Sequence, residues 1–282
     1  SLRRELEKRK FTERRAGIIL TGRGLALLDS LGISGRIPGR AFEVKYTRND
    51  YLDKLVPEIE NLVAERPDPD VTLDQSHATV ETIIRRVAYI YERDALESKD
   101  ILFLGDDDLT SLAVLKFADE FGIKLGLITV MDVDQRILDY IHETSEKMGW
   151  VVETVCHDLK EPLPGLYNDR FDVFVSDPPY TLSGISLFAL RGGQALKPVL
   201  GKKGVLCFSK REPVESRLLY ANLNIMGLVP QELLPSFNRY VGAQLHAGSS
   251  SLLLCASEGS SNFNIDFDVD KIYTASRKQR KD

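Results

Sequence analysis

Between residues 76 and 256, short apolar segments alternate with amphipathic ones, and this alternation restricts the fold more than any other feature. Short apolar runs predict strands, and apolar residues spaced three and four apart predict helices. Strands joined through helices lie parallel, with right-handed crossovers. The predicted strands span 101–104, 125–131, 151–155, 171–175, 204–209 and 251–256, and the predicted helices span 80–91, 109–121, 135–147, 182–197 and 214–226. The sequence therefore predicts an α/β fold with a Rossmann-like, doubly wound, mostly parallel sheet.

The segments outside this pattern suggest two further parts of the chain. Residues 1–70 combine charged helical segments with one short apolar run, and a Pro-Asp-Pro-Asp linker follows at 67–70. We expect 1–70 to be a small α-rich, winged-helix-like domain, shortened at its start because the chain does not begin with Met. Residues 71–257 would form the Rossmann-like catalytic domain. Residues 258–282 are polar and predict a mobile tail.

The cysteines and histidines argue against a fold held together by disulfides or by structural zinc. The three cysteines are far apart and odd in number, which argues against a disulfide scaffold and indicates a reducing, cytoplasmic location. The four histidines show no ligand spacing, so we expect no structural zinc site. No run of about 18 apolar residues occurs, so we expect no membrane-spanning segment.

Charge is concentrated in the middle of the chain. Residues 100–180 hold 17 acidic and six basic residues, whereas the whole chain carries a net charge of −5. An acidic surface is a poor match for nucleic acid, because binding to phosphates depends on cationic contacts. It suits a cationic ligand better. A plain solvated face would give the same charge excess, so the motifs have to separate the two interpretations.

The first predicted parallel strand ends in Gly105, Asp106, Asp107 and Asp108. In dinucleotide-binding folds this turn is rich in glycine, and its amides face a pyrophosphate. Three carboxylates would repel a phosphate and attract an ammonium or sulfonium group. A divalent-metal site or a simple turn remain as alternatives.

Acidic residues also follow the next two strands. Asp132 ends the second strand, where an acid commonly accepts hydrogen bonds from ribose hydroxyls, and Asp134 is placed to cap the following helix. His157 and Asp158 follow the third strand, at a position that often contacts a base. Asp158 could equally be an ordinary turn residue.

The fourth strand leads into Asp177-Pro178-Pro179-Tyr180. Two prolines fix the turn and hold the aspartate forward. Asp177 can then accept a proton or a hydrogen bond from an amine, and Tyr180 can offer an aromatic face to a base or a cation. The alternative is a rigid strand exit without chemistry.

Together, the segments 105–111, 132–134, 157–164 and 177–181 closely resemble the branched-chain polyamine synthases of thermophilic archaea and bacteria. The resemblance extends from about residue 74 to residue 227. It implies a winged-helix-like amino-terminal domain, a Rossmann-like catalytic domain and a homodimer.

The resemblance also implies the reaction. The enzyme would be an aminopropyltransferase that alkylates the secondary amine of spermidine, giving a branched polyamine and methylthioadenosine. Decarboxylated S-adenosylmethionine would be the co-substrate, with no tightly bound cofactor and no metal. Acids around the aminopropyl arm would repel the carboxylate of ordinary S-adenosylmethionine.

The resemblance assigns roles to individual residues. Asp107 and Asp177 are both candidates for the catalytic proton acceptor, and the sequence does not choose between them. The expected substrate-binding residues are Asp106, Asp108, Pro178 and Tyr180, with the two acids holding ammonium groups unless one of them caps the helix. The expected nucleoside-binding residues are Gly105, Asp132, His157 and Asp158.

One departure and two alternatives stay open. Arg239 lies where the family carries acidic and aromatic residues, which leaves the acceptor side in doubt. A methyltransferase acting on an exocyclic amine of adenine would share the Asp-Pro-Pro-Tyr turn, but would need a basic channel. A non-enzymatic winged-helix regulator sensing a cationic metabolite would bind DNA through residues 1–70, whose charge is near zero.

Overall fold

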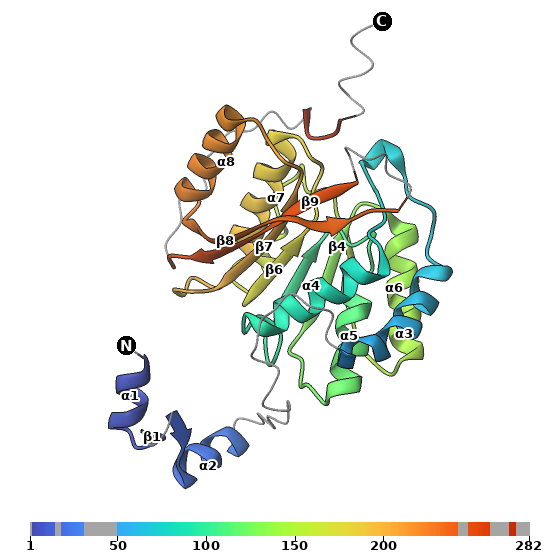
Figure 1. The fold of residues 1–282 in the computed structure, drawn as a ribbon. Coiled ribbons are helices and arrows are strands. Elements are labelled where there is room, and N and C mark those ends of the chain that lie inside the picture. The colour runs from blue at the N-terminus through green and yellow to red at the C-terminus, as the bar shows by residue number, and fades with distance from the viewer. Residues whose placement is uncertain (1, 15–17, 31–49, 242–247, 260–270, 275–282) are drawn as a thin grey trace, which may run out of the picture.

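The computed structural model describes residues 2–14, 18–30, 50–241, 248–259 and 271–274. Its centre is a seven-stranded sheet with the order β5-β4-β3-β6-β7-β9-β8 (Figure 1). The strands are β3 (Ile101–Leu104), β4 (Ile128–Asp132), β5 (Glu153–Cys156), β6 (Val173–Ser176), β7 (Lys203–Phe208), β8 (Leu228–Arg239) and β9 (Ser249–Ser257). β3 to β7 are parallel, whereas β9 is antiparallel to both β7 and β8. The predicted doubly wound α/β fold is confirmed.

Helices cover both faces of the sheet (Figure 1). α3 (Leu55–Ala64), α4 (Val80–Glu92), α5 (Thr110–Phe121) and α6 (Gln135–Lys147) pack on one face, and α7 (Leu182–Ala195) and α8 (Pro213–Ile225) pack on the other. Alternate residues of one strand enter different cores: Ile101 and Phe103 face the first, Leu102 and Leu104 the second. Because both faces are covered, these strands are apolar throughout and show no alternation in the sequence.

The structure contains one long strand that the sequence analysis missed. β8 lies at the edge of the sheet and pairs with β9, with irregular register between Pro230 and Glu232 and between Leu234 and Asn238. Prolines at 230 and 235 weaken the strand pattern, but an edge strand tolerates proline because one side of its backbone has no partner strand.

The domain boundary near residue 70 stays a prediction. The structure shows that α3, which precedes this boundary, packs against helices that follow it. Leu55, Ile59 and Leu62 of α3 are buried in the core that also holds α4 and α5. Before it, α1 (Leu2–Lys8), β1 (Thr12–Arg14), β2 (Ile18–Leu20) and α2 (Gly22–Ser30) form a helix, a two-stranded antiparallel sheet and a helix. The winged-helix assignment of this part also stays a prediction.

Among helices formed by described residues, none has both the length and the apolar character needed to cross a membrane.

Candidate active site

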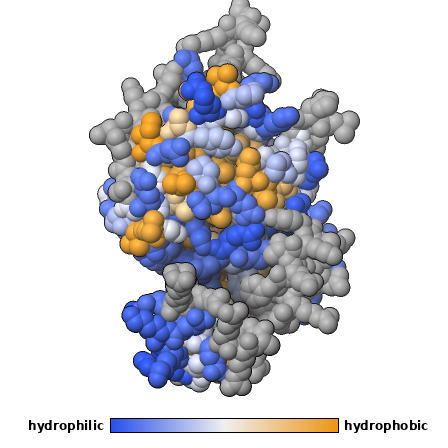
Figure 2. Space-filling model, turned by 60° about the vertical axis from the view of Figure 1, so that its left-hand side comes forward, coloured by the Kyte–Doolittle hydropathy of each residue, from blue (hydrophilic) through white to orange (hydrophobic). Residues whose placement is uncertain are grey.

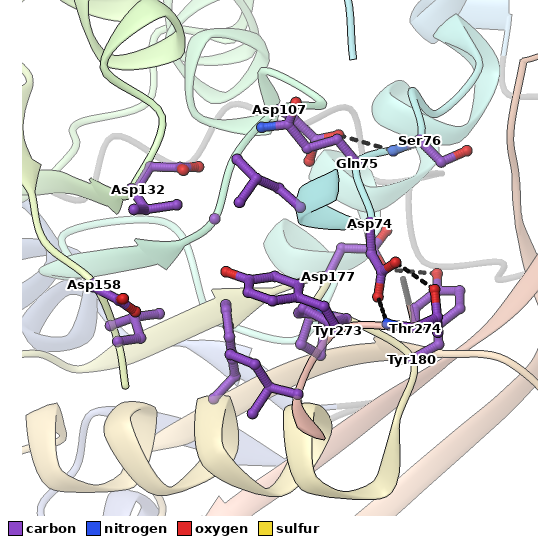
Figure 3. A pocket seen from close by; sticks show the side chains of 18 of the residues that line it. Asp74, Gln75, Ser76, Asp107, Asp132, Asp158, Asp177, Tyr180, Tyr273 and Thr274 are labelled. Atoms are coloured by element: carbon purple, nitrogen blue, oxygen red, sulfur yellow. Dashed lines mark hydrogen bonds between the residues drawn. The ribbon is translucent and has the colours of Figure 1, made fainter. Parts of the chain in front are cut away.

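A cavity of about 270 Å³ opens at the carboxyl ends of the parallel strands, the usual ligand site of such sheets. Figure 3 shows acidic side chains from several elements around it. Eight of the ten predicted site residues line it, namely Gly105, Asp107, Asp132, His157, Asp158, Asp177, Pro178 and Tyr180. The remaining two, Asp106 and Asp108, do not.

The turn after β3 sends neighbouring carboxylates in different directions. Gly105 has a φ of +72°, which glycine adopts without steric cost, and the Leu109 N–H donates to the carbonyl of Asp106 at 2.9 Å. The Asp106 carboxylate then accepts the N–H groups of Thr110 (2.9 Å) and Ser111 (3.0 Å). Asp106 therefore caps the start of α5.

Asp108 also turns away from the cavity. Its carboxylate accepts the N–H of Ala78 and pairs with Nη1 of Arg86 at 2.5 Å, and both side chains of this ion pair are 4% exposed. Neither Asp106 nor Asp108 lines the cavity, which corrects the expectation that both hold substrate ammonium groups, and Asp106 takes the helix-capping role that the sequence analysis left open.

Asp107 is the acid of this turn that reaches the cavity. It accepts the N–H of Ser76 at 3.2 Å, and among the described side chains no Lys or Arg forms an ion pair with it. Loss of solvent raises the pKa of Asp107 well above the ordinary value, and repulsion from Asp108 and Asp177 raises it further. Asp107 is therefore a carboxyl group with a high proton affinity, placed at the wall of the cavity.

Asp177 follows β6, the strand paired with β3, and lies in a network of donors. Its Oδ1 accepts the hydroxyl of Tyr180 at 2.7 Å, and its Oδ2 accepts Nη2 of Arg86 at 2.5 Å and the hydroxyl of Tyr240 at 2.6 Å. Burial raises the pKa of Asp177, while the charge of Arg86 opposes that rise. The two prolines of the turn and three donors hold this carboxylate at the cavity in one orientation.

Sequence reasoning missed Arg86, although a signal was present. Arg86 lies three residues after Ile83 and four before Ile90, on the apolar face of α4, and is 3% exposed. An arginine at such a position needs a buried partner. Its two carboxylate partners belong to the two acidic motifs that the sequence analysis singled out.

The carboxyl end of β8 completes this side of the cavity. Tyr240 lines the cavity and Asn238 accepts Nε of Arg86 at 2.8 Å, whereas Arg239 is exposed and lies outside the lining. Arg239, the arginine that departs from the family pattern, therefore points away from the cavity, because neighbouring strand residues face opposite ways.

The opposite side of the cavity carries the residues expected to bind the nucleoside. The Asp132 carboxylate accepts the N–H groups of Asp106 (3.1 Å) and Asp134 (2.8 Å), which ties the ends of β3 and β4 together. As expected, Asp134 caps α6 by accepting the N–H of Arg136. Asp158 accepts the N–H of Lys160 at 3.0 Å. A ligand along these loops would meet carboxylates from β4 and from the loop after β5.

Two further segments close the cavity, and periodicity in the sequence gave no sign of either. Leu73 to Ser76 approach from the loop before α4, and Ile272 to Thr274 approach from the last described segment. Ile272 is 1% exposed, and its carbonyl accepts the hydroxyl of Thr181 at 2.7 Å. The ring of Tyr273 points toward Asp132 and Asp158 (Figure 3), and burial followed by repulsion from Asp158 and Asp132 raises its pKa to about 12.

Residues 271–274 differ from the expected mobile tail, while the expectation for the rest of 258–282 stays a prediction. Residues 271–274 contribute a buried side chain and part of the cavity wall. Residues 260–270 and 275–282 lie outside the described part of the chain. The polar composition concealed this contact because Ile272 is the one aliphatic side chain among residues 271–274.

Comparison with known proteins places this site in a family. The family model described as branched-chain polyamine synthase A C-terminal domain matches residues 54–280. An uncharacterized protein of Methanocaldococcus jannaschii is 39% identical over 231 residues, which are 80% of this chain and 56% of that protein. A Thermococcus kodakarensis protein named N(4)-bis(aminopropyl)spermidine synthase is 32% identical over 235 residues, 79% of this chain and 64% of that protein. The chain thus spans less than two thirds of the length of these relatives.

Solved structures show the same fold. The branched-chain polyamine synthase of Thermus thermophilus, in complex with N4-aminopropylspermidine and 5'-methylthioadenosine, aligns with a TM-score of 0.66 at 24% identity. The alignment covers 94% of this chain and 81% of that one. The family model extends from the start of α3 past the segment that closes the cavity, so it contains every residue of the acidic site described above. The chain therefore belongs to the branched-chain polyamine synthase family.

Proposed function

We propose that this protein is an aminopropyltransferase that moves aminopropyl groups from decarboxylated S-adenosylmethionine to the secondary amine of spermidine. The products are a branched polyamine and methylthioadenosine. The observation that carries the proposal is the charge of the cavity. Five aspartates line it, and no Lys or Arg occurs among the described lining residues: the aspartates are Asp74, Asp107, Asp132, Asp158 and Asp177.

This charge fits both substrates of the proposed reaction. The donor carries a sulfonium group and an ammonium group but no carboxylate, and the acceptor is a polycation near neutral pH. Carboxylates in a site shielded from water attract such groups strongly. The same carboxylates repel the carboxylate of ordinary S-adenosylmethionine, so donor selection follows from charge.

The geometry supports a division of the cavity into two parts. Asp132, His157 and Asp158 form one side, with Asp132 proposed to bind the ribose and the loop after β5 proposed to face the base. Asp177, Pro178, Tyr180 and Tyr240 form the other side, proposed to hold the acceptor. Asp107 lies between the two, where the attacking nitrogen and the sulfonium methylene have to meet.

The reaction needs a neutral nitrogen. The acceptor ammonium gives a proton to a carboxylate, and its lone pair attacks the methylene carbon next to the sulfur. The carbon–sulfur bond breaks with its electron pair going to sulfur, so the sulfonium becomes a neutral thioether and the nitrogen gains an aminopropyl group. Asp107 and Asp177 both reach the cavity and remain the two candidates for the proton acceptor.

A product assay tests the proposal. The protein is incubated with spermidine and either decarboxylated or ordinary S-adenosylmethionine, and products are identified by mass spectrometry. We expect aminopropyl addition at the secondary nitrogen, with methylthioadenosine released from the decarboxylated donor alone; one addition or two gives the stoichiometry. Methyl transfer from the ordinary donor to nucleic acid or protein, with no product from spermidine, would overturn the proposal.

We also propose a homodimer, with the edge of the sheet at the interface. Exposed apolar side chains lie on α8 and on the edge strand β8, including Ile225 (49% exposed) and Leu233 (43% exposed). Figure 2 shows apolar residues among polar ones on one side of the molecule. Sedimentation equilibrium should give twice the chain mass of 31.7 kDa, and Leu233→Lys should lower it to that of the monomer. A monomer in the unaltered protein would refute this arrangement.

A cytoplasmic location stays a prediction.

A further inference from the structure

Arg86 joins the two acidic motifs from behind the cavity. Its guanidinium donates to four groups: Asp108 and Asp177 at 2.5 Å each, Asn238 at 2.8 Å and the hydroxyl of Tyr240 at 3.2 Å. It is 3% exposed and does not line the cavity. Arg86 therefore has no access to a substrate, and any effect it has on the reaction must pass through its partners.

Arg86 donates to two of three neighbouring acids and not to the third, Asp107. Asp108 and Asp177 each receive a charged N–H group, and such charge-assisted bonds favour the ionised form of a carboxyl group. Asp107 receives the backbone N–H of Ser76 instead. One guanidinium thus offsets part of the charge of two carboxylates and leaves the third beside them without such a partner.

The charges around Asp107 strengthen this difference. Repulsion comes from four acids: Asp106 and Asp108 of the same turn, and Asp132 and Asp177 at the ends of the neighbouring strands β4 and β6. The guanidinium of Arg66 attracts Asp107 electrostatically, and it attracts Asp108 more strongly. Bringing a proton to Asp107 relieves this repulsion, whereas bringing one to Asp177 breaks a hydrogen bond with Arg86.

We infer that Arg86 is the positioning residue that directs the amine proton to Asp107, by pairing with Asp108 and holding Asp177 as a carboxylate. The inference rests on the proposed function, because it assigns the proton of that reaction. The acceptor ammonium gives its proton to the Asp107 carboxylate, and its lone pair forms the new carbon–nitrogen bond as the carbon–sulfur bond breaks toward sulfur. Asp177 keeps its charge throughout and faces an ammonium group of the acceptor.

Loss of Arg86 should change where the proton goes. In Arg86→Gln, Asp177 loses its cationic partner and competes with Asp107 for the proton. The double variant Arg86→Gln/Asp108→Asn removes one positive and one negative charge, so it separates the loss of the bond to Asp177 from a change in net charge. Arg86→Lys keeps the charge and should restore part of the effect.

The first measurement does not depend on turnover. Carboxyl groups of aspartate are labelled with 13C and their resonances are titrated, with Asp107→Asn and Asp177→Asn used for assignment. In the unaltered protein we expect Asp177 to stay ionised where Asp107 takes up a proton. In the double variant Asp177 should take up a proton at a pH about one unit higher than before. An unchanged Asp177 titration would overturn the inference.

The second measurement is the pH dependence of kcat/KM for aminopropyl transfer. In both Arg86→Gln variants its acidic limb should move up by about one pH unit, which is about a tenfold loss of rate below the limb. Arg191→Gln is the matched control: Arg191 is a 7% exposed arginine that donates to the carbonyls of Leu159 and Lys160 rather than to a carboxylate. We expect this control to lower stability without moving the limb.

The two measurements also separate the inference from the proposed function. If the unaltered protein makes no aminopropyl product, the proposed function fails, while the 13C titration still reports which acid takes the proton. If the protein is active and Arg86→Gln leaves the acidic limb in place, the proposed function stands and the role of Arg86 is refuted.

Discussion

The carboxylate of Asp74 accepts the backbone N–H of Thr274 at 2.7 Å, although 200 residues separate the two in the chain. The hydroxyl of Thr274 also donates to Asp74. Both residues line the cavity, so this pair joins the loop before α4 to the last described segment at the cavity wall.

Removing this pair should loosen the last segment without unfolding the protein. Asp74 is partly exposed, and a hydrogen bond of this kind contributes about 1 kcal/mol. In Asp74→Ala we expect the amide of Thr274 to exchange about fivefold faster, as measured by hydrogen exchange. Asp139→Ala removes an exposed acid on α6 and serves as the control. Equal exchange in all three proteins would show that the contact does not hold the segment.

Asp107 and Asp177 should differ in the kinetic parameter that they control. Asp107→Asn cannot take up the amine proton, so kcat should fall by about 10²–10⁴. Asp177→Asn keeps its size but loses the charge that faces the acceptor, so kcat/KM should fall strongly and KM for the polyamine should rise.

Steady-state kinetics and thermal unfolding of both variants check this prediction. Both should stay folded, and Asp119→Asn, which affects a surface bond to Trp150, should behave like the unaltered protein. Near-normal rates in both site variants would refute the proposed mechanism.

Asp106 should make stability depend on pH. Burial raises its pKa to about 7, although bonds from Ser111 oppose this rise. Between about pH 4 and pH 7 the folded protein therefore holds a proton that the unfolded chain has released. The free energy of unfolding should fall as the pH rises through this window.

Urea unfolding at several pH values measures this slope. Asp106→Asn cannot titrate, so its free energy of unfolding should depend less on pH between 4 and 7 than that of the unaltered protein. Identical slopes in the two proteins would contradict the assignment.

Phe174 should make Gly204 sensitive to substitution. Phe174 is fully buried, and a Cβ on Gly204 would overlap its ring. Gly204→Ala should lower the free energy of unfolding by about 1–3 kcal/mol, because the packed core cannot move away at no cost. Gly165→Ala is the control, since nothing lies near a Cβ at that position. Equal urea midpoints for the two variants would argue against the tight contact.

Local sequence patterns predicted most of the sheet. The predicted bounds of β3 agree with the observed ones, because four apolar residues stand between a charged residue and glycine. β4 begins three residues later than expected, since apolar residues 125–127 belong to the loop that precedes it. β8 is not predicted, because its prolines and polar residues interrupt the apolar pattern by which a strand is recognised.

The acidic site, like the sheet, is predicted only in part from the sequence. The sequence determined which residue types follow each strand, and strand parallelism requires those ends to meet at one edge of the sheet. The sequence therefore places Asp107, Asp132, Asp158 and Asp177 after four strands whose carboxyl ends share one edge. Their proximity follows from the order of elements alone.

Only the tertiary structure assigned a direction to each carboxylate. Asp106, Asp107 and Asp108 are alike in sequence, yet one caps α5, one faces the cavity and one pairs with Arg86. This outcome depends on the φ angles of a single turn and on partners from α4 and the loop before it. The sequence thus determined that acids gather at this sheet edge, whereas long-range donors such as Arg86 decided which of them can meet a substrate, because a buried carboxylate turns toward whichever donor compensates its lost hydration.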